Sequence, residues 1–78
     1  MLQITFKSTG KDFILKLDGG LAGPGVENLA RFWRSLREAM LHRGTKVDLS
    51  ELHRVDGNGK RLLEAMQSDG AELIGAIS

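Results

Sequence analysis

The sequence predicts a small α/β domain with a mixed sheet of four strands, in the order β-β-α-β-α-β, and two helices on one face. Three observations lead to this fold class. Apolar residues alternate in the first part of the chain, two later segments carry apolar residues at helical spacing, and strands joined through helices pair in parallel. The 78 residues form a single domain, 1–78, because a second core does not fit in this length.

The first two strands are recognised by alternation. Apolar residues occupy every second position from Leu2 to Phe6 and again from Phe13 to Leu17, with a turn over 8–12 between them. The short connection predicts an antiparallel hairpin. Since most residues between the apolar ones are polar, with Lys16 and Asp18 outward in the second strand, we expect one face of the sheet to remain uncovered.

The first helix is predicted by a single apolar stripe with spacings of 3, 4, 3 and 4 residues. Gly44 is placed where a C-terminal cap is needed. Phe32 lies at the margin of the stripe, so it is either half-buried or a contact residue. The stripe consists of Val26, Leu29, Trp33, Leu36 and Met40.

The second half of the chain predicts a short third strand over 46–50, a loop over 51–54, a helix from about Gly59 to Ser68 and a fourth strand over 71–77. We expect Asp56 or Asn58 to cap the second helix. Its buried side is formed by Leu62, Leu63 and Met66.

Composition argues against nucleic acid and membrane partners. Eleven basic and ten acidic residues give a net charge of +1, and the helices that carry the arginines also carry glutamates at pairing distance. No apolar run reaches the roughly 18 residues of a membrane span, and the start lacks the apolar stretch of a signal peptide. We therefore expect a soluble cytoplasmic protein without direct membrane insertion.

Motifs for catalysis, cofactors and metals are missing or fail on spacing. The glycines of 19–25 do not follow the G-x-G-x-x-G order and predict a turn. Gly59-Lys60 lacks the earlier glycine and the hydroxyl residue of a P-loop, and Lys60 would repel calcium in an EF-hand reading of the same loop. His42 and His53 lack the spacing of metal ligands, and no cysteine is present. We expect no enzyme activity, no cofactor and no metal.

One loop remains as a candidate site. It lies between the end of the third strand and the start of the second helix, where free amides and the helix dipole favour negative groups. Capping of the helix alone would also explain its composition. The candidate partner-binding residues are Asp56, Gly57, Asn58, Gly59, Lys60 and Arg61.

The segment from Val47 to Ala76 resembles the centre of a STAS domain, the fold of anti-sigma-factor antagonists and sulphate-transporter tails. The shared motifs are Asp48-Leu49-Ser50 at the end of a strand and Asp56-x-x-Gly59 before a helix with a double leucine. The resemblance extends from about Ile4 to Ile74. It implies a non-catalytic protein-interaction module whose partner is a regulator of the anti-sigma kinase type.

In the regulatory members that this chain resembles, a serine or threonine two residues after the aspartate is phosphorylated, and the phosphate breaks the complex. Asn58 occupies this position, and Gly57 replaces the residue before it. Asn58 cannot be phosphorylated, so it resembles a permanently unphosphorylated state. The nearest hydroxyl, Ser50, belongs to the strand end.

Three alternatives remain open at this point: a small STAS subunit of a lipid-type ABC transporter, a nucleotide- or small-ligand-binding module, and a self-assembling subunit. The family resembled continues past the fourth strand with another helix, whereas this chain stops at Ser78. The resemblance therefore implies open apolar surface near the fourth strand, where a partner or a second copy, as in a homodimer, would pack.

Overall fold

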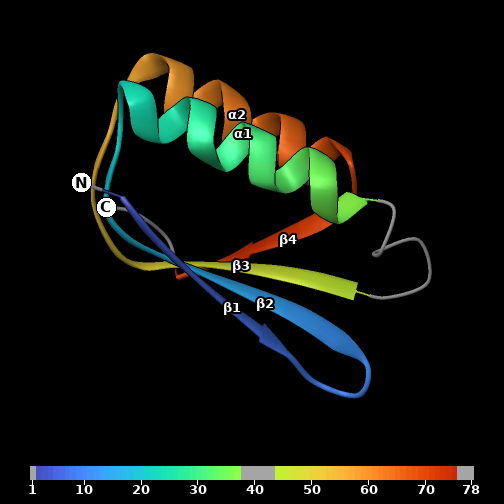
Figure 1. The fold of residues 1–78 in the computed structure, drawn as a ribbon. Helices are drawn as coiled ribbons and strands as arrows, with labels where there is room; N and C mark the ends of the chain where they lie inside the picture. Colours follow the sequence, from blue (N-terminus) through green and yellow to red (C-terminus); the bar gives the residue numbers. More distant parts are fainter. Residues whose placement is uncertain (1, 38–43, 76–78) are drawn as a thin grey trace.

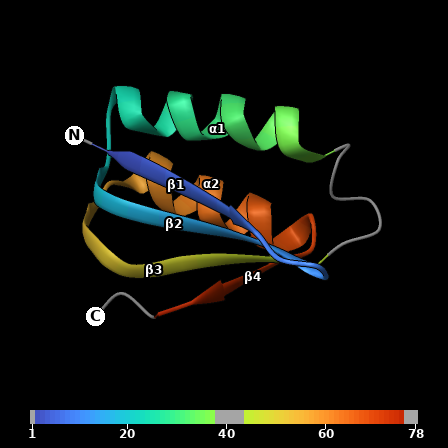
Figure 2. The ribbon, with the colours of Figure 1, turned by 60° about the horizontal axis from the view of Figure 1, so that its bottom comes forward.

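The computed structural model describes residues 2–37 and 44–75, which form a four-stranded sheet with two helices on one of its faces (Figures 1 and 2). This arrangement confirms the predicted fold class and the predicted placement of the helices. The elements are β1 (Gln3–Ser8), β2 (Asp12–Leu21), α1 (Pro24–Arg37), β3 (Gly44–Val55), α2 (Gly57–Ser68) and β4 (Ala71–Ile74).

The strands lie in the sheet in the same order as in the chain. β1 pairs with β2 in antiparallel orientation, whereas β2 with β3 and β3 with β4 pair in parallel. The hairpin and the mixed sheet predicted from the sequence are both confirmed. Because each parallel connection passes through a helix, α1 and α2 lie side by side over the sheet (Figure 2).

The two central strands are longer than the sequence predicts. β2 continues through Gly19 and Gly20 to Leu21, and β3 continues through the predicted loop 51–54 to Val55. Pairing between the two strands holds both extensions in place, with irregularities in the register between Lys16 and Asp18 and between Gly19 and Gly20. The predicted loop at 51–54 is therefore wrong, and the predicted turn at 19–25 is wrong for its first three residues.

The helix boundaries also differ. α1 begins at Pro24, because proline is well suited to the first position of a helix. α2 begins at Gly57, two residues earlier than predicted, since Asp56 caps it. Gly44 is the first residue of β3 and not a helix cap. The predictions for Met40, His42 and the strand residues beyond 75 lie outside the described residues.

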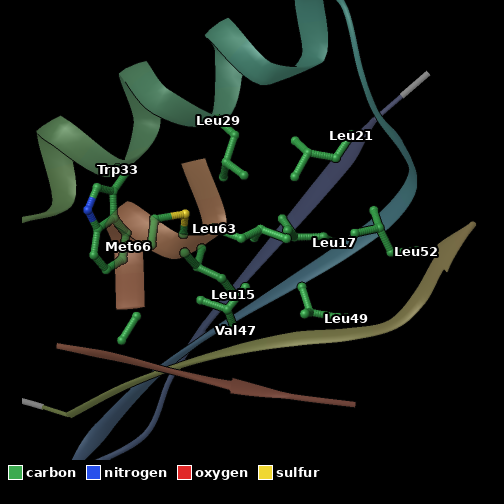
Figure 3. Packing of buried hydrophobic residues seen from close by; sticks show 11 residues of the cluster. Leu15, Leu17, Leu21, Leu29, Trp33, Val47, Leu49, Leu52, Leu63 and Met66 are labelled. Atoms are coloured by element: carbon green, nitrogen blue, oxygen red, sulfur yellow. The ribbon is translucent and has the colours of Figure 1, made fainter. Parts of the chain in front are cut away.

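The core lies between the sheet and the two helices (Figure 3). The predicted inward residues of β2 are buried, and so are Leu29 and Trp33 of α1 and Leu63 and Met66 of α2. Leu62 and Phe32 are half-buried at the margin. The apolar stripes therefore point to the core as predicted.

The other face of the sheet carries charged side chains. Lys16 of β2 lies opposite Asp48 of β3, and Lys46 of β3 lies opposite Glu72 of β4. Cross-strand pairs of opposite charge are favourable, and they allow this face to stay in water. No helix within 2–37 or 44–75 has the length and apolar character needed to cross a bilayer.

Candidate functional site

The candidate loop lies where two parallel strands end and two helices begin. Leu21 at the end of β2 pairs with Val55 at the end of β3, and the chain enters α1 and α2 directly after them. Both helices therefore start at the same edge of the sheet (Figure 1). In an open α/β sheet, binding sites are concentrated at this edge, because the strand ends and helix N-termini meet there.

The Asp56 side chain connects the starts of the two helices. One carboxylate oxygen, Oδ1, accepts a hydrogen bond from the Gly59 N–H at 2.7 Å. The other, Oδ2, accepts from the Gly23 N–H at 3.1 Å, in the turn that precedes α1. The Asp56 N–H in turn donates to the Leu21 carbonyl at 3.1 Å. A single residue thus fixes the loop against the end of β2 and the turn before α1.

These contacts also set the charge of the site. The Gly59 N–H, followed by the Gly23 N–H, lowers the pKa of Asp56 below its ordinary value of 3.8, and the nearby Arg54 acts in the same direction. Asp56 is therefore ionised at neutral pH, as its role as a cap requires.

Gly59 allows α2 to lie close to β2. A Cβ at this position would be 2.5 Å from the Leu21 carbonyl oxygen and 2.9 Å from the Leu21 Cγ, distances that real Cβ atoms do not show. Gly57 has no heavy atom within 4 Å of an added Cβ. Packing therefore requires a glycine at position 59 but not at position 57.

The remaining predicted residues form an exposed rim. Gly57, Asn58, Lys60 and Arg61 are all exposed, while Gly59 is buried. The rim combines the positive end of α2, one neutral amide and two cations. It provides hydrogen-bond donors and positive charge, which suit the binding of a negatively charged group.

An apolar pocket opens next to the rim. It has a volume of about 380 Å³ and lies between α2 and the strands β3 and β4. Lys60 belongs to both the rim and the pocket, so the two features are continuous. The lining residues are Leu49, Val55, Lys60, Leu63, Glu64 and Leu73.

Sequence reasoning missed two parts of this site. The contact between Asp56 and Gly23 joins residues 33 positions apart, and only the pairing of β2 with β3 brings them together. The signal was the position of Gly23 directly before Pro24, which is typical of a helix start. The pocket was expected only in general terms, as open apolar surface near the fourth strand.

His53, the one histidine among the described residues, does not line the rim or the pocket. His53 is exposed on β3, and His42 lies outside the described residues. Within 2–37 and 44–75, no group of three or more His, Asp or Glu side chains is arranged to hold a metal ion.

Comparisons with known proteins assign the fold. No protein-family model matches the sequence, and no curated protein matches it significantly. Among solved structures, the anti-sigma factor antagonist SpoIIAA in its unphosphorylated form aligns with a TM-score of 0.76 at 15% identity, over 100% of this chain and 76% of SpoIIAA.

Two further structures are similar. An antisigma-factor antagonist STAS domain from Rhodobacter sphaeroides aligns with a TM-score of 0.69 at 20% identity, over 95% of this chain and 86% of that domain. Mglu aligns with a TM-score of 0.73 at 24% identity over 90% of this chain, which spans only 19% of the Mglu chain. The protein therefore has a STAS-like fold.

Proposed function

We propose that the protein is a non-catalytic interaction module that binds a protein partner through the Asp56–Gly59 loop and the first turn of α2. The proposal rests on one observation: Asp56 is held in place by hydrogen bonds, while the rim beside it is exposed. Asp56 is held by Gly59 and Gly23, whereas Asn58, Lys60 and Arg61 face solvent. A rigid, exposed loop costs little entropy to bind, which favours recognition.

The partner class follows from the rim and from the fold. Lys60 and Arg61 favour an acidic surface on the partner. The similarity to SpoIIAA and to the Rhodobacter sphaeroides domain supports a regulator of the anti-sigma kinase type as that partner. Such regulators act on transcription in the cytoplasm, so we place the protein there.

Asn58 determines whether the loop can be regulated by phosphorylation. The residue lies in the first turn of α2 and is exposed, as a phospho-acceptor would have to be. Its amide is neutral and cannot accept a phosphoryl group. We therefore place the protein in a permanently binding-competent state, which corresponds to the unphosphorylated form of a regulated antagonist.

The first test compares the wild type with two variants of position 58: Asn58→Asp changes the charge of the side chain, and Asn58→Gln lengthens it by one methylene without adding charge. Immobilised wild-type protein, Asn58→Asp and Asn58→Gln are used to capture proteins from a lysate of the source cell, and captured candidates are purified for calorimetric titration. We expect an anti-sigma kinase-like protein to bind the wild type and Asn58→Gln. Binding to Asn58→Asp weakens by on the order of tenfold or more, because the new charge repels an acidic partner surface.

The Asn58→Asp variant stays folded, because an acidic residue in the first turn of a helix is stabilised by the dipole, by about 0.3–1 kcal/mol. Loss of binding is then separable from unfolding by a thermal melt. If the captured partner binds all three proteins equally, the loop is not the interface. Capture of a transporter subunit in place of a kinase would contradict the proposed partner class.

A second test restores the missing hydroxyl. Asn58→Ser places a hydroxyl at an exposed position of the first turn, and we expect the partner kinase to phosphorylate it in the presence of ATP, as measured by intact-mass spectrometry. The wild type serves as the control and gains no mass. An unmodified Asn58→Ser variant would contradict the assignment of position 58.

A further inference from the structure

We propose that the protein also self-associates head to tail, with the β1 edge of one copy paired to the β4 edge of the next. β1 and β4 are the outer strands of the sheet, and among the described residues no strand lies beyond either. In the described part of the chain, the large apolar side chains that are exposed lie on these same strands: Phe6 at 41% on β1 and Ile74 at 36% on β4. This surface is separate from the Asp56 loop and goes beyond the proposed function.

In the proposed alignment, the strand registers of one copy continue into the next copy. Rows of directly paired residues run across all four strands. If β4 of one copy pairs with β1 of the next in the same register, each row continues into the second copy. Glu72 then lies opposite Lys7 of the next copy, Leu73 opposite Phe6, and Ile74 opposite Thr5. The rows are Lys7–Ile14–Lys46–Glu72, Phe6–Leu15–Val47–Leu73 and Thr5–Lys16–Asp48–Ile74.

Charge complementarity favours the pairing of unlike edges. Lys7 and Glu72 are both exposed on the open face of the sheet, and the continued row sets them directly opposite each other. Two β4 strands paired antiparallel would instead place Glu72 opposite a second Glu72 or opposite Ile74, without an ion pair. The β1-to-β4 contact therefore places Glu72 between two lysines, Lys46 of its own sheet and Lys7 of the next copy, whereas the β4-to-β4 contact adds no cation beside it.

The helix face of the same contact is apolar. Phe6 points to this face, where its ring centroid lies 5.1 Å from that of Phe13 and 6.2 Å from that of Phe32. On the other edge, half-buried Leu73 lines the pocket of about 380 Å³ beneath α2. The continued row brings Phe6 of the next copy against Leu73, so that the aromatic cluster covers the open side of the pocket.

The geometry also determines the kind of assembly. An interface between two different surfaces leaves a free edge at each end of every open oligomer, so growth stops only where the rotation between copies closes a ring. The twist of the sheet would turn such an assembly into a helix rather than a flat ribbon.

The test uses the full chain and two charge reversals, Lys7→Glu and Glu72→Lys. Sedimentation velocity is measured from micromolar to sub-millimolar concentration. We expect the weight-average mass of the wild type to rise continuously, beyond that of a dimer. Each single variant weakens association by on the order of tenfold, because like charges then face each other across the contact. Lys11→Glu, an equal change in the exposed hairpin turn, serves as the matched control and behaves like the wild type.

Mixing provides the decisive readout. Lys7→Glu and Glu72→Lys each associate more weakly than the wild type, but a mixture of the two restores opposite charges at every contact, and so does the double variant. Circular dichroism confirms that each protein is folded, and an unfolded variant could not be restored by mixing. A wild type that remains monomeric, one that stops at a dimer, or a mixture that does not associate would each overturn the proposal.

Discussion

Two glycines at the start of α2 have opposite environments and predict opposite effects of the same substitution. Gly59→Ala forces a Cβ into the Leu21 carbonyl oxygen, which would be only 2.5 Å away. We expect the free energy of unfolding to fall by about 1–3 kcal/mol, as in other overpacked sites. Urea denaturation monitored by circular dichroism measures the change.

Gly57→Ala is the matched control. An added Cβ meets no atom within 4 Å, and Gly57 lies in the first turn of a helix. The substitution reduces the entropy of the unfolded chain, so we expect a gain of about 0.4–1 kcal/mol. Equal losses in the two variants would contradict the close approach of α2 to β2.

Because of Asp56, we expect the free energy of unfolding to decrease at acid pH. Its pKa is lowered in the folded protein by the Gly59 and Gly23 N–H groups, from an ordinary value of 3.8. As pH falls, the unfolded chain therefore takes up the proton first. The contribution of this carboxylate is fully present above pH 3.8 and is lost as pH falls through the lower folded pKa.

The corresponding experiment is a series of thermal melts from neutral pH down to acid. Asp56→Asn has no carboxylate to protonate, so its melting temperature falls less steeply over the acid range than that of the wild type. Asp48→Asn is a useful comparison, because the pKa of Asp48 is also lowered, chiefly by the Ser50 N–H. An equally steep decrease at acid pH in Asp56→Asn would show that the cap does not contribute.

Some of these residue roles could be predicted from the sequence and others could not. An aspartate directly before a helical stripe predicts an N-cap from local chemistry alone, and Asp56 has that role. The requirement for glycine at position 59 comes from Leu21, which ends β2 and not β3, the strand that leads into α2. No local pattern contains such a contact, because it depends on how two strands end side by side.

The same distinction holds for helices and strands. The apolar stripes predicted both helices and their buried sides, since helical periodicity is a property of each segment alone. The ends of β2 and β3 were predicted too early, because Gly19, Gly20 and the polar segment 51–54 have low strand propensity. Parallel pairing of the two strands outweighs that local preference.

The contact between α1 and the end of α2 gives a prediction for the helix layer. The buried Trp33 side chain donates through Nε1 to Asp69 Oδ2 at 2.9 Å. Trp33→Phe removes the donor and leaves a gap where the larger indole ring packed, so we expect a loss of at least about 1–2 kcal/mol. A double-mutant cycle with Asp69→Ala isolates the pair. Fully additive losses would show that the two side chains are not coupled.

At the level of the molecule, the fold separates three surfaces. The carboxyl ends of β2 and β3 carry the fixed loop, the two outer strands carry the exposed apolar residues, and the open face of the sheet is charged. The sequence resemblance to STAS domains pointed to the first surface. The resemblance also led us to expect apolar surface near the fourth strand, whereas the part of the second surface on β1 became visible only with the strand order, since Phe6 and Ile74 are far apart in the chain and share no motif.

The central claim is that a protein partner binds at the Asp56–Gly59 loop and the start of α2. Amide chemical shifts of ¹⁵N-labelled protein, recorded while the purified partner is titrated in, test it most directly. We predict that the largest changes cluster at Gly23 and at residues 56–61. Changes confined to the outer strands or to the charged face of the sheet, with the loop unaffected, would contradict it.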